Sequence, residues 1–369
     1  MILVSAAVMA TGLTLAGCSS SDSSSGGGAT AVATKGGTTP KVGVILPDTK
    51  SSARWATADL KYLTAAFKAA GVDADIQNAQ GDKTQFQTIA DQMITSGVNV
   101  LMIVNLDSGS GKAVLEKAKA QGIATIDYDR LTLGGGADFY VSFNNVKVGE
   151  LQGEGLQKCL TADNKTKANI AFLNGSPTDN NATLFKQGAV KALKAKTDSG
   201  DYKVVADQAV PDWDNQQAGT IFEQMYTDNG GKIDGVLAAN DGLGNAAIAI
   251  LKKNKVNGTV PVTGQDATDQ GLQNILAGDQ CMTVYKAVKK EADAASALAI
   301  ALAKGQDTKS LATAATMDTT TKKDVPSVLL DPEAIYFDNV KDVIADGYTT
   351  KANVCTAALE AACAKAGIK

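Results

Sequence analysis

The sequence predicts an α/β protein with two doubly wound parallel-sheet lobes joined by a three-segment hinge. The chain has 369 residues, which is too long for one ordinary core. Apolar strand segments alternate with helical segments, as in parallel βαβ units. The layout also repeats: residues 97–105 and 123–129 are strands that end in Asn and Asp, and residues 233–240 and 260–266 echo them. Two similar halves follow from this repeat.

The N-terminal stretch, residues 1–17, is apolar and built of small side chains, and it closes on Leu15-Ala16-Gly17-Cys18. It resembles the lipobox of bacterial lipoprotein signal peptides, which implies a signal peptide over residues 1–18 and lipidation of Cys18. A short buried helix is the alternative. The basic segment that usually opens such a signal is absent, so the true translation start is open. Residues 19–39 are rich in Ser, Gly and Thr and predict a flexible tether.

The first lobe is predicted over residues 40–145 plus 287–330. Residues 42–46 form an apolar run that Pro47 ends, as expected of a buried strand. The helix that follows carries Leu60, Leu63 and Phe67 on one face before Gly71 stops it. The remaining predicted elements are strands near 72–78, 98–104, 123–129 and 139–143, and helices over 84–96 and 112–121.

The second lobe is predicted over residues 146–286 plus 331–369. The chain enters it after Asn144 through a helix that ends near Leu160. An Ala-rich helix from about 287 to 303 suits a return to the first lobe, and residues 325–337 have strand character around a Pro-containing turn. The predicted strands are 168–174, 202–206, 235–239, 260–263 and 282–285, with helices starting near 180, 215, 244 and 269.

Composition excludes several classes of function. A net charge of -4 and a pI near 5.1 give no reason to expect nucleic acid. The sequence has no histidine, which rules out a Ser-His-Asp triad and disfavours most hydrolases and metalloenzymes. The glycine-containing pieces 108–111 and 241–244 lack a complete phosphate-loop pattern and are read as turns. No metal and no cofactor is predicted.

Four cysteines remain once Cys18 is set aside. Cys355 and Cys363 are close in sequence and are candidates to bridge each other, which leaves Cys159 and Cys281 as the second pair. Four cysteines allow three pairings, and free buried thiols are a further alternative, so the sequence alone leaves the connectivity open.

Polar side chains stand where predicted strands end. Asp129 and Arg130 close the 123–129 strand, and Asn240, Asp266 and Lys286 each follow another apolar strand. Ligands bind at the carboxyl ends of strands in open α/β sheets. Taken singly, each is an ordinary strand-end residue. Together they predict a ring of donors and acceptors around one cleft, which suits a polyol.

The two tryptophans are the candidate stacking groups. Arg54 and Trp55 lie at a predicted helix start above a strand end, and Trp213 lies in a loop between two aspartates. An aromatic face packs well against the C–H side of a sugar ring, so the pair is predicted to sandwich one. The alternative is that Trp55 packs into the lobe and Arg54 is only solvated.

Residues 175–181 follow a strand and precede a helix. Asp or Asn at a helix start is most often a cap. Capping accounts for one of the three consecutive polar side chains at 179–181, so Asp179 or Asn181 is predicted to contact the ligand.

Several motifs follow one another between residues 41 and 337. They are Ala53-Arg54-Trp55, Tyr128-Asp129-Arg130, residues 139–143 with 147–152, Gly175-Ser176-Pro177 with residues 179–182, Asn240-Asp241, residues 264–267 and residues 282–286. This ordered set resembles the periplasmic sugar-binding proteins of ABC transporters, and most closely their D-xylose-binding members. Asn144 departs from an Asp of that group, and the segment with Cys355 and Cys363 extends beyond it.

The resemblance implies a type I periplasmic binding protein fold and a ligand in the interlobe cleft. The implied contacts are Arg54, Asp129, Arg130, Asp179, Asn181, Trp213, Asn240, Asp266 and Lys286, to which the stacking argument adds Trp55. It implies an exported, lipid-anchored, monomeric solute-binding protein, at the outer face of the cytoplasmic membrane or in the periplasm. That protein closes on a monosaccharide, D-xylose first, and delivers it to a permease and its ATPase. The alternatives are another pentose or hexose, such as ribose, arabinose, glucose or galactose, a chemosensory role, or a sugar-modifying enzyme.

Overall fold

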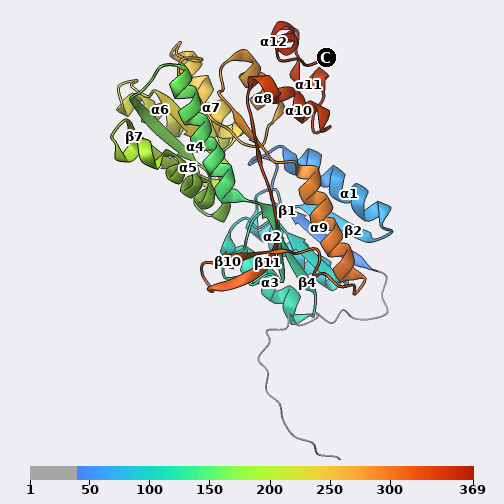
Figure 1. The fold of residues 1–369 in the computed structure, drawn as a ribbon. Helices are drawn as coiled ribbons and strands as arrows, with labels where there is room; N and C mark the ends of the chain where they lie inside the picture. The colour runs from blue at the N-terminus through green and yellow to red at the C-terminus, as the bar shows by residue number, and fades with distance from the viewer. Residues whose placement is uncertain (1–39) are drawn as a thin grey trace, which may run out of the picture. The chain divides into compact units, whose positions relative to one another are not determined.

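The computed structural model describes residues 40–369, so Cys18, the signal segment and the tether over 19–39 lie outside the described residues. Strands alternate with helices along the described chain, as Figure 1 shows, which confirms the α/β prediction. No helix in residues 40–369 is both long enough and apolar enough to cross a membrane.

The first sheet has seven strands in the order β10-β11-β5-β4-β3-β1-β2. All neighbours are parallel except β10 and β11, which form an antiparallel hairpin. The strands are β1 (Lys41–Leu46), β2 (Asp73–Asn78), β3 (Val100–Ile103), β4 (Ala124–Tyr128), β5 (Phe139–Phe143), β10 (Ala314–Asp318) and β11 (Lys323–Leu330).

Helices bury both faces of this sheet, which is why its inner strands are continuous apolar runs. Along β1, Val44 packs toward α1 (Leu60–Ala69) and α9 (Val288–Ala303), while Ile45 packs toward α2 (Lys83–Thr95) and α3 (Ser108–Ala120). The alternation follows from successive side chains pointing to opposite faces of a strand.

The second sheet is smaller, with three parallel strands in the order β7-β6-β8. Its strands are β6 (Ala168–Asn174), β7 (Tyr202–Ala209) and β8 (Gly235–Ala238). Its helices are α4 (Asn145–Ala162), α5 (Asn180–Asp198), α6 (Asn215–Asp228), α7 (Asp241–Lys253) and α8 (Asp269–Ala277).

Three sequence predictions of local structure are wrong. Residues 260–263 make only one bridge, between Val236 and Val262, because Pro261 has no N–H to extend the ladder. Residues 108–111 and 241–244, read as turns, are instead the first turns of α3 and α7, capped by Asp107 and Asn240. Strand β10 was not predicted.

The chain passes between the two sheets through three connections, from β5 to α4, from β9 (Thr283–Tyr285) to α9, and from β11 to β12 (Glu333–Ile335). Strands β9 and β12 pair with each other as an antiparallel ribbon. Three connections are what the predicted hinge requires, while the lobe boundaries themselves stay a prediction.

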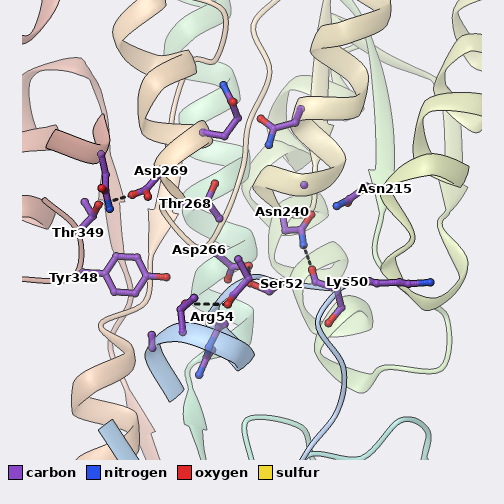
Figure 2. A pocket seen from close by; sticks show the side chains of 18 of the residues that line it. Lys50, Ser52, Arg54, Asn215, Asn240, Asp266, Thr268, Asp269, Tyr348 and Thr349 are labelled. Carbon is purple, nitrogen blue, oxygen red and sulfur yellow. Dashed lines mark hydrogen bonds between the residues drawn. The ribbon is translucent and has the colours of Figure 1, made fainter. Parts of the chain in front are cut away.

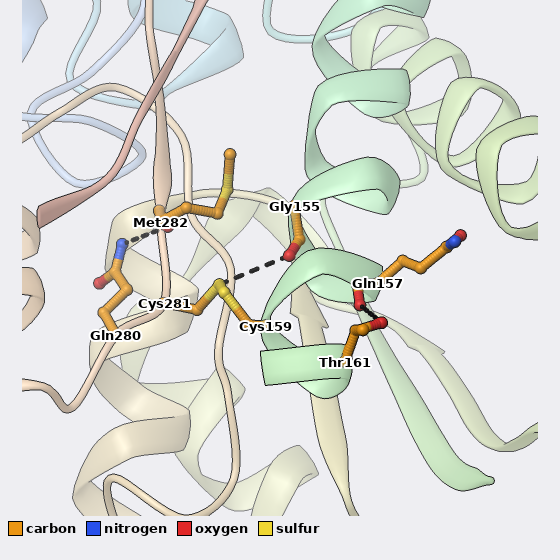
Figure 3. Close-up of a disulfide and its surroundings, with 7 residues drawn as sticks. All are labelled: Gly155, Gln157, Cys159, Thr161, Gln280, Cys281 and Met282. Carbon is orange, nitrogen blue, oxygen red and sulfur yellow. Dashed lines mark hydrogen bonds between the residues drawn. A yellow bond between two sulfur atoms is a disulfide. The ribbon is translucent and has the colours of Figure 1, made fainter. Parts of the chain in front are cut away.

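The last part of the chain packs as a separate apolar cluster next to α8. It contains the short helices α10 (Val340–Ala345), α11 (Lys351–Val354) and α12 (Glu360–Lys365), the last two joined by a Cys355–Cys363 disulfide. A second disulfide joins Cys159 near the end of α4 to Cys281 ahead of β9 (Figure 3). The structure thus selects one of the three pairings that the sequence left open.

Candidate binding chamber between the strand ends

The predicted site residues surround one small chamber. All ten line it: Arg54, Trp55, Asp129, Arg130, Asp179, Asn181, Trp213, Asn240, Asp266 and Lys286. We call this space the inner chamber. Ser51, Ser52, Phe185 and Gln265 also line it, although the sequence analysis did not select them. The lining comes from the carboxyl ends of strands in both sheets, which is why residues far apart in sequence meet there.

Arg54 is buried and held by carboxylates rather than solvated. Its Nε and Nη2 donate to Asp59 at 2.8 Å, its Nη1 donates to Asp129 Oδ2 at 2.9 Å, and Nη2 also donates to Glu291. One Nη1–H is left for a ligand. The guanidinium carbon lies 4.4 Å from the centre of the Trp55 ring. Trp55 belongs to the core beside α1 and also lines the chamber, so both readings of Trp55 hold.

Asp129 follows β4 with a left-handed backbone (φ 61°), a conformation that non-glycine residues rarely adopt. Its N–H donates to Val141 O, and its carbonyl accepts from Tyr140, Ser142 and Asn181, which together hold this conformation. Burial alone would raise its pKa, but Lys286, Arg54 and Arg130 hold the pKa of the Asp129 carboxyl below its ordinary value. The group is therefore an ionised acceptor.

Arg130 and Asp179 form an ion pair between residues of the two sheets. Arg130 Nε lies 3.0 Å from Asp179 Oδ2, and Arg130 also donates to Ser51 Oγ. Asp179 caps α5 by accepting from the Asn181 N–H, so one residue both caps the helix and faces the chamber. Burial raises the pKa of Asp179, although Arg130 opposes the shift.

Trp213 lies in a short 3₁₀ turn, 5% exposed, and is part of the core rather than a loop side chain at the surface. Its Nε1 donates to Asp179 Oδ2 at 3.1 Å. The ring stacks edge-on against Phe185 and lies over Gly175, where a Cβ would approach the ring to 2.0 Å. Glycine at 175 is thus needed for Trp213 to line the chamber.

Lys286 and Asp266 also line the inner chamber and form an ion pair. The Lys286 Nζ lies 3.4 Å from Asp266 Oδ1 and 3.6 Å from Asp129 Oδ2. Asp266 Oδ2 accepts from Ser52, and Asn240 Nδ2 donates to the Ser51 carbonyl. Asp266 has a positive φ of 95°, so the strand-end aspartates of the two halves share a strained backbone.

A buried network behind Arg54 was missed by the sequence analysis. Asp59 accepts from the Tyr128 hydroxyl as well as from Arg54, and Glu291 reaches Arg54 from α9. Burial, opposed by Arg54, raises the pKa of Glu291 to about 8. A lone Glu on the buried face of an Ala-rich helix was the available signal for Glu291.

The chamber suits a neutral polar ligand. Three cationic side chains (Arg54, Arg130 and Lys286) and three carboxylates (Asp129, Asp179 and Asp266) line it. Donors and acceptors in equal number can bind the hydroxyl groups of a sugar, and the tryptophan rings can pack against its C–H face. Among the described residues, no group of three or more His, Cys, Asp or Glu could hold a metal ion.

Curated relatives resemble the chain over most of its length. It is 38% identical over 312 residues to a D-xylose-binding periplasmic protein of Escherichia coli (strain K12), covering 84% of this chain and 90% of the relative. It is 35% identical over 331 residues to the multiple sugar-binding periplasmic receptor ChvE of Rhizobium radiobacter, covering 85% of this chain and 91% of the relative.

Solved structures give the same result. A carbohydrate transporter solute-binding protein from Chloroflexus aurantiacus, in complex with D-glucose, matches with a TM-score of 0.76 and 28% identity over 85% of this chain and 98% of that one. The fold is therefore that of the type I periplasmic binding proteins, as predicted. Because a family model described as a periplasmic binding protein domain also matches residues 42–307, the chain is a member of the periplasmic binding protein family.

Proposed function

We propose that this protein is the solute-binding component of an ABC sugar importer and binds a monosaccharide in the inner chamber. D-xylose is the first candidate for that monosaccharide. The observation that carries the proposal is the meeting of all ten predicted side chains, charge-balanced and flanked by Trp55 and Trp213, around one small space.

The relatives support the choice of sugar. Two of them are named D-xylose-binding periplasmic proteins, and others are named multiple sugar-binding proteins. In this chain, Arg54, Arg130 and Lys286 would donate to ring and hydroxyl oxygens, and Asp129, Asp179 and Asp266 would accept from hydroxyls. Hydrogen bonds to ionised groups are the stronger kind, so a few of them select one arrangement of hydroxyls.

Binding is proposed to close the lobes, because the chamber is complete only when strand ends of both sheets meet around the ligand. The closed form would then be what the permease and its ATPase recognise. Small-angle scattering is expected to report a smaller radius of gyration with sugar than without it, and equal radii would contradict closure.

Transport rather than catalysis is proposed because the carboxylates at the chamber have fixed partners. A glycosidase needs one carboxyl free to donate a proton and another free to act as a base or nucleophile. Here Asp129, Asp179 and Asp266 each lie within ion-pair distance of a cation. We expect no turnover of aryl xylosides.

Export and anchoring are proposed from the sequence outside the described residues. The periplasmic relatives support export, and the Cys18 lipobox supports a lipid anchor with the 19–39 segment as spacer. Cys18→Ser is expected to move the protein from the membrane fraction to the soluble fraction. The anchored protein is proposed to act as a monomer.

The deciding experiment is a panel of monosaccharides in a thermal-shift assay followed by calorimetry. A ligand that binds only the folded protein raises its apparent stability, so D-xylose is expected to give a large shift. The panel should include ribose, arabinose, glucose and galactose, with xylitol as a ring-free control. A shift with no sugar at all would overturn the proposal, and a larger shift with a hexose would correct the ligand.

A further inference from the structure

A larger second chamber adjoins the inner one and opens to solvent. Its volume is about 470 Å³, and Figure 2 shows part of its lining. We call it the outer chamber. The two chambers share the lining residues Ser51, Ser52, Arg54, Asn240 and Asp266. A ligand group that passed between these residues would therefore leave one chamber and enter the other.

The partition between the chambers is held by two hydrogen bonds. Ser52 Oγ donates to Asp266 Oδ2 at 2.9 Å, and Asn240 Nδ2 donates to the Ser51 carbonyl at 3.1 Å. Hydrogen bonds of this kind contribute only about 0.5–1.5 kcal/mol each, or somewhat more to a charged group. Sugar hydroxyls both donate and accept hydrogen bonds. They can therefore replace the Ser52–Asp266 and Asn240–Ser51 hydrogen bonds when a sugar chain extends from one chamber into the other.

The outer chamber is lined by amide and hydroxyl groups from both halves of the molecule. Asn215 and Asn245 come from α6 and α7, Thr57 and Tyr62 from the opposite side, and Tyr348 from the C-terminal segment. Within residues 40–369, neither the Tyr348 hydroxyl nor the Asn215 amide hydrogen-bonds to another residue; Tyr348 is partly buried, and Asn215 is exposed to solvent at the rim. Figure 2 shows the Tyr348 ring pointing its hydroxyl into the space toward Asp266.

Charge in the outer chamber also disfavours an ionic ligand. The lining carries cations, Lys50, Arg54 and Lys61, together with the carboxylates of Asp266 and Asp269. Asp269 already accepts a hydrogen bond from Thr349. The Tyr348 ring is fixed by packing on Tyr285, with ring centres 5.3 Å apart, so its hydroxyl is presented at a defined place.

We propose that the outer chamber is a second carbohydrate subsite, which holds the next unit of a short sugar chain or glycoside whose terminal unit occupies the inner chamber. This inference rests on the proposed function and extends it from a monosaccharide to a disaccharide. The extra volume, the unpaired Tyr348 and Asn215 groups and the shared partition carry the inference together.

The test is calorimetry with D-xylose and with its β-1,4-linked disaccharide, xylobiose. Xylobiose is expected to bind within about tenfold of D-xylose. Tyr348→Phe and Asn215→Ala each remove one hydrogen-bonding group, so each is expected to weaken xylobiose roughly 3- to 10-fold. Neither change is expected to move D-xylose affinity by more than about twofold. Gln217→Ala, an exposed position on the same helix as Asn215, is the matched control and should change neither.

The outcomes separate this inference from the proposed function. D-xylose binding with xylobiose more than about 100-fold weaker overturns the second subsite and leaves the function standing. Equal losses for both sugars in the Tyr348→Phe and Asn215→Ala proteins also overturn it, because the contacts would then belong to the inner chamber. Binding of neither sugar overturns the inference, and failure of the whole monosaccharide panel overturns the function with it. Thermal midpoints of the variants confirm that they are folded.

Discussion

Single charged residues in the inner chamber are buried, and each has a fixed partner. Removing water from a charge is costly unless another charge and hydrogen bonds replace it. Arg54 meets this condition through the carboxylates of Asp59 and Asp129, and Glu291 is a further hydrogen-bond partner. The side chains that face the ligand are therefore oriented before it arrives, which lowers the entropy that binding costs.

Removing one charged group from the chamber is expected to weaken sugar binding strongly. Asp266→Ala or Arg130→Ala takes away a charge-assisted hydrogen bond and leaves Lys286 or Asp179 with one partner fewer. We expect a loss of roughly 2–4 kcal/mol, or about 30- to 1,000-fold in affinity, by calorimetry. Asp212→Asn, in an exposed position next to Trp213, is the control. Undiminished affinity in both variants would remove these residues from the site.

The ten site residues were predictable because strand ends of a parallel sheet collect at one edge, so local sequence indicates a shared location. Asp59 and Glu291 were not predictable in the same way. Asp59 contacts Arg54 within one helical segment, whereas Glu291 contacts Arg54 only because α9 packs against that segment and α1. Nothing near Glu291 in the sequence indicates its pairing with Arg54.

Among the elements, the close packing of α4 against α5 positions part of the chamber. A Cβ at Gly149 on α4 would lie 1.8 Å from the Phe185 carbonyl oxygen, and one at Gly188 on α5 would lie 2.0 Å from the Val146 carbonyl oxygen. The two backbones can approach only because both positions are glycine. α5 carries Asn181 and Phe185, so its distance from α4 sets where they stand.

Gly149→Ala is expected to destabilise the protein and to weaken binding as well. The methyl group forces α5 outward, and overpacking of this kind costs about 1–3 kcal/mol or more. Gly219→Ala on α6, where a Cβ meets nothing within 4 Å, is the matched control. It is expected to be neutral or to stabilise by up to ~1 kcal/mol, because alanine favours helix. Urea unfolding compares the two, and equal midpoints would contradict the packing argument.

The predicted elements were mostly correct because their apolar periodicity is strong, and the misses have local causes. Residues 260–263 are apolar enough for a strand, but Pro261 and the positive φ values of Asp266 and Ala267 turn the chain away. In β10, Met317 is 57% exposed at the edge of the sheet, so no buried apolar run marks the strand.

For the whole molecule, Glu291 makes stability depend on pH. Burial raises its folded pKa from the ordinary 4.5 to about 8, so between these values the folded protein keeps a proton that the unfolded chain releases. Stability is therefore expected to fall as pH rises through this window. Asp129 acts oppositely: its lowered pKa contributes stability that is lost as pH falls below the ordinary value.

The expected result is a thermal midpoint that is highest near pH 5 and declines toward pH 8 at constant ionic strength. Burial also raises the pKa values of Asp127 and Asp241 to about 7, so these two carboxyls contribute to the same decline. Glu291→Gln, which is neutral throughout, is expected to make the decline shallower, most clearly toward pH 8. An unchanged slope in that variant would assign the pH dependence to other groups.

The Cys159–Cys281 bridge also determines how the chain responds to mechanical force. The two cysteines are 122 positions apart, and a stretched backbone spans about 3.5 Å per residue. When the molecule is pulled by its two ends, the force passes through the disulfide rather than through the segment between the two cysteines. That segment, which would be roughly 400 Å long if fully stretched, therefore does not extend. Reduction by a thiol should restore that length in a single-molecule extension trace. If the protein is held at its N-terminus by the proposed lipid anchor, a force on the other end would leave the segment between the two cysteines unstretched.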